Sequence, residues 1–90
     1  MTINLENLTD VKEATLKIKH QFSREGGEMD CVTKLYHDAG IIGRISAHIS
    51  NSEASDMKRL KEMHLKYFAE TLEEQKYKVR VEGNTISISR

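Results

Sequence analysis

The last part of the chain constrains the fold most, because residues 77–89 alternate between apolar and polar side chains. A period of two is typical of a strand with one buried face. Gly83-Asn84 interrupts the alternation, and such a two-residue loop is typical of a β-hairpin. With this loop, Val81 lies opposite Ile86 and all apolar side chains share one face. The hairpin therefore needs an apolar element to cover it.

A long amphipathic helix over residues 53–75 is the expected cover. Residues 50–56 are rich in helix-capping side chains, and helical spacing then places a set of large side chains on one face. The predicted inward residues are Met57, Leu60, His64, Tyr67, Phe68, Thr71 and Leu72. We expect Phe68 and Leu72 to pack on the hairpin.

Two further helices are predicted in the first half of the chain, over residues 10–25 and 28–39. Asp10 and Glu13 have the spacing of a capping box, and Gly26-Gly27 is typical of a helix end. The apolar stripes that indicate these helices comprise Val11, Ala14, Ile18 and Phe22 in the first, and Met29, Val32, Tyr36 and Ala39 in the second.

Residues 41–50 are ambiguous. Their period of two favours a strand or irregular structure, while Ile41, Ile45 and Ile49 would also form a narrow helical stripe. Ile3 and Leu5 alternate with polar neighbours and are consistent with a third strand. The sequence thus predicts one α+β domain over residues 1–90, with about three helices packed on one face of a small antiparallel sheet that includes the C-terminal β-hairpin.

Composition limits the classes of protein. The 90 residues carry 14 basic and 14 acidic side chains, one Cys and no Pro, with a formal net charge of zero. A chain of this size has a marginal core, which favours self-association. The single cysteine fits a reducing compartment, and no apolar run approaches the roughly 18 residues of a membrane span. We expect a cytoplasmic protein without membrane contact.

No motif indicates catalysis. The four histidines and Cys31 lack the spacing of metal ligands, and no Gly-rich phosphate loop is present. We therefore expect no catalytic residue, cofactor or metal, although an enzyme with His37 or His48 as general base is a weaker alternative.

The favoured hypothesis is a small non-enzymatic binding or regulatory protein that acts through protein–protein contacts, as a homodimer. Aromatic residues and Met are enriched in dry interfaces. The candidate partner contacts are Met57, Met63, Tyr67 and Tyr77.

The alternative hypothesis is a nucleic-acid-binding protein. The segment Val32–Ile49 resembles the helix-turn-helix of bacterial repressors, and helices followed by a hairpin resemble a winged helix. This resemblance implies binding to DNA. The candidate nucleic-acid contacts are Arg44, Arg59, Lys61, Lys78 and Arg80.

Overall fold

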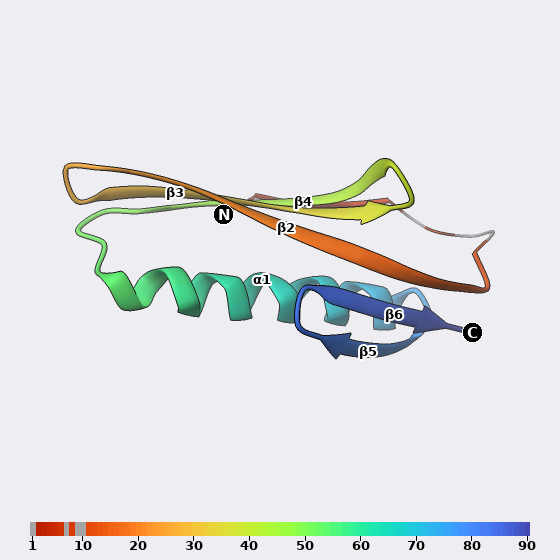
Figure 1. Cartoon of the computed structure of the whole chain (residues 1–90). Coiled ribbons are helices and arrows are strands. Elements are labelled where there is room, and N and C mark those ends of the chain that lie inside the picture. Colours follow the sequence, from red (N-terminus) through yellow and green to blue (C-terminus); the bar gives the residue numbers. More distant parts are fainter. Residues whose placement is uncertain (1, 7, 9–10) are drawn as a thin grey trace.

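Six antiparallel strands form one sheet, and a single helix covers one of its faces in the described chain (Figure 1). The computed structural model describes residues 2–6, 8 and 11–90. Its elements are β1 (Thr2–Leu5), β2 (Glu13–Glu25), β3 (Glu28–His37), β4 (Gly40–Ile49), α1 (Ala54–Glu74), β5 (Lys78–Glu82) and β6 (Thr85–Ser89). The strand order is β1-β4-β3-β2-β6-β5. The predicted architecture of about three helices is therefore wrong, since the described chain is mostly β.

The helix predicted over residues 10–25 is wrong because most of this segment forms β2. Ile18 and Phe22 are four residues apart, and side chains at this spacing lie on the same face both in a helix and in a strand. Leu16 distinguishes the two, because it is fully buried on the inner face of β2 but lies off the helical stripe. The proposed capping residue Asp10 lies outside the described residues.

The helix predicted over residues 28–39 is also wrong, because this segment forms β3. Every second side chain of β3 is buried against the helix, namely Met29, Cys31, Thr33 and Leu35. Gly26 and Gly27 adopt φ angles of +55° and +86°. Positive φ at both positions suits a tight hairpin turn, so these glycines join β2 to β3 and do not end a helix.

Residues 41–50 follow the strand interpretation, since β4 spans nearly all of them. The strand expected at Ile3 and Leu5 is confirmed as β1, which pairs with β4.

Because Val32–Ile49 consists of two paired strands, the helix-turn-helix and winged-helix interpretations are wrong.

The C-terminal hairpin and the long helix are confirmed. Val81 lies opposite Ile86 in the predicted register, and Gly83 has φ +54°. The helix α1 begins after Glu53, whose backbone N–H donates to Asp56 Oδ2 at 2.7 Å.

The helix packs on the sheet through Leu60, His64, Phe68 and Leu72, which are its buried residues. Phe68 lies close to β4 because Gly43 leaves room for its ring: a Cβ on Gly43 would lie 2.9 Å from Phe68 Cε1. The main apolar cluster surrounds Phe68 and Leu72, and a smaller one comprises Met29, Cys31 and Leu60.

The outer strands of the sheet are β1 and β5. The C-terminal strand β6 is not an edge, because it lies between β2 and β5. The helix occupies only one side of the sheet, so no described element covers the opposite, outer face (Figure 1).

Candidate functional site

β2 lies between β3 and β6, and it extends beyond the end of β6. The side of β2 that faces β6 is therefore unpaired over part of its length. The pairing with β6 covers Glu13–Lys17, and a last hydrogen bond joins the Ile18 N–H to the Asn84 carbonyl at 2.8 Å. On its other side β2 stays paired with β3 up to Glu25. Within the described ranges no strand pairs with this side of Lys19–Glu25, which we call the open edge.

The backbone groups of the open edge alternate in direction. Because the Ile18 N–H points toward β6, the N–H and C=O groups of His20, Phe22 and Arg24 point the same way, away from β3. Their side chains lie on the helix-facing side of the sheet. Such a row of unpaired donors and acceptors is a template for another extended chain.

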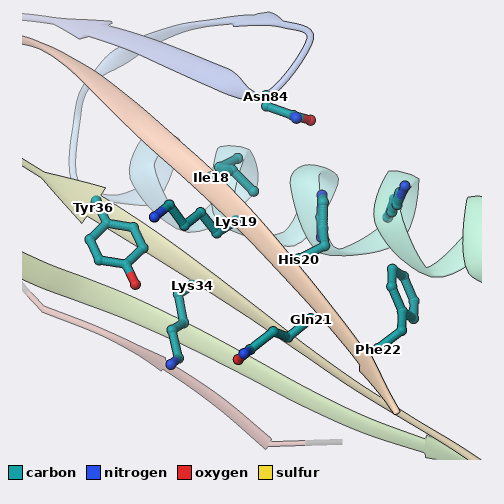
Figure 2. A pocket seen from close by; sticks show the side chains of 9 residues that line it. Ile18, Lys19, His20, Gln21, Phe22, Lys34, Tyr36 and Asn84 are labelled. Carbon is teal, nitrogen blue, oxygen red and sulfur yellow. The ribbon is translucent and has the colours of Figure 1, made fainter. Parts of the chain in front are cut away.

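A hollow of about 510 Å³ follows the open edge (Figure 2). It is lined by Ile18, His20 and Phe22 on the inner side of β2, by Lys61 of α1, by Lys19, Gln21, Lys34 and Tyr36 from the outer face, and by Asn84 in the β5–β6 turn. The hollow therefore occupies the position where a strand next to β2 would lie.

The charged side chains that line the hollow beside His20 are all lysines: Lys19, Lys34 and Lys61. The Lys61 ammonium lies 5.6 Å from the centre of the Phe22 ring. None of these lysines forms an ion pair with an acid in the described part of the chain. The hollow thus favours an anionic ligand.

Beneath the open edge lies a chain of polar side chains in the core. Thr33 Oγ1 is 2.8 Å from His20 Nδ1 and 2.6 Å from His64 Nδ1. Because a hydroxyl has one hydrogen, Thr33 donates to one imidazole and accepts an N–H from the other. The two Nε2 atoms are buried and have no hydrogen-bond partner among the described residues.

Burial lowers the pKa of both His20 and His64, since it disfavours the charged imidazole. Lys61 lowers the pKa of His20 further, and both rings are neutral at pH 7. Burial raises the pKa of the Cys31 thiol, whose sulfur lies 3.8 Å from His64 Nδ1. Cys31 and Thr33 are fully buried, so neither presents a nucleophile to the hollow.

The other two histidines lie away from the hollow. His48 is exposed on β4, 2.7 Å from Asp30 and 2.9 Å from Glu28, and the hydrogen bond to Asp30 raises its pKa. His37 lies 3.8 Å from Asp38 near the β3–β4 turn. In the part of the chain that the structure describes, no group of three His, Cys, Asp or Glu side chains is arranged to hold a metal ion.

The four candidate partner contacts do not line the hollow. Tyr77 is only 4% exposed, and its hydroxyl lies 2.5 Å from the Leu8 carbonyl. Met57 and Tyr67 are half-buried against the core clusters, and Met63 is also half-buried.

The five candidate nucleic-acid contacts are dispersed, and only Lys61 lines the hollow. Arg44 lies on the outer face of β4, and Lys78 is exposed on β5. Two are engaged in ion pairs on their own elements: Arg59 with Asp56 and Arg80 with Glu82, both at 2.6 Å.

Sequence reasoning missed the residues of the open edge because it placed them on a helix. The signal that identifies them is the alternation of Lys17, Lys19 and Gln21 with Leu16, Ile18 and His20. Read with a period of two, this run predicts a strand with a cationic outer face.

Comparison with known proteins finds no family model that matches the chain, and no curated protein or solved structure that resembles it significantly. No helix in the described residues is long and apolar enough to cross a membrane. Functional inference therefore rests on the geometry of the site.

Proposed function

We propose that this chain is a non-enzymatic protein-binding module, which takes an extended acidic segment of another protein as an added strand along the open edge. The observation that carries the proposal is the bare side of Lys19–Glu25, where β2 lacks the neighbour that β6 provides earlier in the strand. Added strands gain affinity from main-chain hydrogen bonds, and side-chain pockets give specificity.

The backbone favours a strand over a helix as the ligand. His20, Phe22 and Arg24 each offer one outward N–H and one outward C=O, at the spacing of alternate residues in a strand. An antiparallel segment at this position continues the line of β6. The carboxylates of the segment would then lie near Lys19 on the outer side and near Lys61 on the helix side.

The charges favour a different acidic chain over a second copy of this protein. A two-fold pairing of open edges around Phe22 would bring the Lys61 side chains of two copies together. Lys61 already lies over the Phe22 ring, so this arrangement brings like charges close in a partly desolvated groove. A second copy of the chain, as in the homodimer expected from the sequence, would compete with the acidic segment for the open edge.

The proposal is tested with a capped heptapeptide that alternates Glu and Val, so that with its glutamates opposite His20 and Phe22 all carboxylates lie on the helix side near Lys61. Binding is followed by calorimetry. Two derivatives of the peptide are compared. One carries N-methyl groups on its odd-numbered residues, and the other carries them on its even-numbered residues. Only one set of N–H groups faces β2, so one derivative should bind like the parent and the other should lose binding. Equal behaviour of the two derivatives contradicts strand addition.

Charge reversal tests the acidic specificity. Lys61→Glu should weaken binding of the Glu-Val peptide by about tenfold or more, because it replaces an attractive contact with a repulsive one. Lys66→Glu is the matched control on the same helix, since Lys66 does not line the hollow. Tighter binding of a Lys-Val peptide, or a stable dimer in sedimentation that excludes the Glu-Val peptide, overturns the proposal.

A further inference from the structure

Four cations gather on the outer face of the sheet, away from the helix. Lys19, Lys34 and Arg44 lie directly opposite one another on β2, β3 and β4. Lys17 lies on the same face of β2, opposite Tyr36 of β3. We call Lys17, Lys19, Lys34 and Arg44, with Tyr36, the cationic face.

The row of three cations destabilises the free protein. Like charges directly opposite one another on neighbouring strands repel, and this applies to both pairs in the row, Lys19 with Lys34 and Lys34 with Arg44. Strands lie about 4.8 Å apart, so the row from Lys19 to Arg44 spans about 10 Å at the backbone. A polyanion bound along the row would remove this repulsion.

Six acids of the described chain form ion pairs, none of them with the cationic face. Their ion pairs are with His37, His48, Arg59, Lys66 and Arg80. No described acid pairs with a cation of the cationic face. The exposed side of α1 is different, because Lys58, Glu62, Lys66 and Glu70 alternate in sign there, as a merely solvated surface does.

An aromatic platform lies beside the row of cations. Tyr36 is half-buried, with the Lys19 ammonium 5.5 Å from its ring centre. Its neighbour across the β3–β4 pairing is Ile41, which is 49% exposed. Tyr36 and Ile41 thus present an apolar surface next to the cations, on a face that no described element covers (Figure 1).

We propose that the cationic face binds single-stranded nucleic acid, with phosphates on the four cations and a base stacked on Tyr36. Proteins that bind single strands combine a positively charged track with aromatic stacking. A duplex is disfavoured because this face has no helix or ribbon that projects into a groove. The cationic face shares Lys19, Lys34 and Tyr36 with the lining of the hollow, whereas Lys17 and Arg44 belong to the cationic face alone and Lys61 to the hollow alone.

The test is fluorescence anisotropy of a labelled single-stranded oligonucleotide of mixed sequence over a range of salt concentrations. For three to four phosphates, log K should fall against log salt with a slope of about −2 to −3. The double variant Lys17→Gln/Arg44→Gln should make this slope shallower by about 1.4. Tyr36→Leu should lower affinity about tenfold and leave the slope unchanged.

Lys58→Gln/Lys66→Gln is the control with the same loss of charge on the helix, and it should bind like the wild type. Lys61→Glu should also retain oligonucleotide binding, which separates this site from the peptide site. An equal loss in the two glutamine double variants, no binding of the wild type at low salt, or tighter binding to duplex DNA or to phosphatidylserine vesicles would overturn the proposal.

Discussion

His64 is fully buried between the helix and the sheet, although each of its ring nitrogens needs a polar partner. Thr33 and Cys31 approach its Nδ1, while its Nε2 lacks a partner in the described structure. His20 reaches the same Thr33 hydroxyl from β2. A protonated imidazole here would bury a charge with no acid beside it, so the folded state holds both rings neutral.

This arrangement predicts loss of stability in mild acid. In the unfolded chain, His20 and His64 take up protons near pH 6.5, whereas burial lowers both pKa values in the folded protein. Protons therefore favour unfolding as the pH falls below about 6.5, by at most about 1.4 kcal/mol per pH unit for each ring. Urea unfolding between pH 5 and 8 measures the slope. His64→Leu should flatten it.

His48 provides a control of opposite sign. Its pKa is raised by the hydrogen bond to Asp30. Its contribution to stability is therefore present below the unfolded pKa and lost as the pH rises through the folded pKa. His48→Gln should therefore remove this opposing slope above about pH 6.5 and leave the loss below pH 6.5 in place. A His64→Leu protein with the wild-type pH dependence would contradict the assignment, since burial raises the pKa of the Cys31 thiol and keeps it out of this range.

At the scale of elements, the sequence predicted α1 and the C-terminal hairpin but not β2 and β3. In the hairpin, Val79 and Val81 are two residues apart, and no helical stripe contains both. In β2, Ile18 and Phe22 fit either period, so choosing the helix left Leu16 unexplained. The open edge was hidden by this error, because a helix has no unpaired side.

Amide hydrogen exchange tests the open edge directly. The amides of His20, Phe22 and Arg24 should exchange rapidly, because their N–H groups point away from β3. Those of Lys19 and Gln21, which point toward β3, should exchange slowly. NMR resolves the two sets residue by residue.

The same strand contains a control for this exchange pattern. Ala14 and Leu16 have the same backbone direction as His20, but they lie where β6 pairs with β2. Their amides should be slow. Uniformly slow exchange along β2 would mean that another chain covers the open edge in solution. Addition of the Glu-Val peptide should slow the amides of His20 and Phe22 selectively.

At the scale of the whole molecule, the strand order brings distant segments together. β6 pairs with β2, and the Arg90 N–H donates to the Lys12 carbonyl at 2.9 Å. The local periodicity of a segment does not indicate which strand it pairs with. The strand order of the sheet could therefore not be predicted from the periodicity of the sequence. The strand order depends instead on the packing of the whole chain, in which α1 covers the apolar face of the sheet.

The last prediction is that this sheet and helix unfold as one unit. Phe68 is fully buried in the main cluster, with the hairpin residues Ile86 and Ile88, and it lies close to Gly43 of β4. Phe68→Ala should lower the free energy of unfolding by about 3–5 kcal/mol, a large part of the roughly 5–13 kcal/mol expected for a chain of this size.

Leu60→Ala is the comparison in the smaller cluster. The half-buried side chains around Leu60 can relax into the space, so the loss should be near the lower end of about 2–5 kcal/mol. Because α1 contributes to both clusters, each variant should unfold in a single transition that is the same by circular dichroism and by tyrosine fluorescence. A Phe68→Ala protein with nearly wild-type stability, or separate transitions for helix and sheet, would show that the helix does not join the sheet into one core.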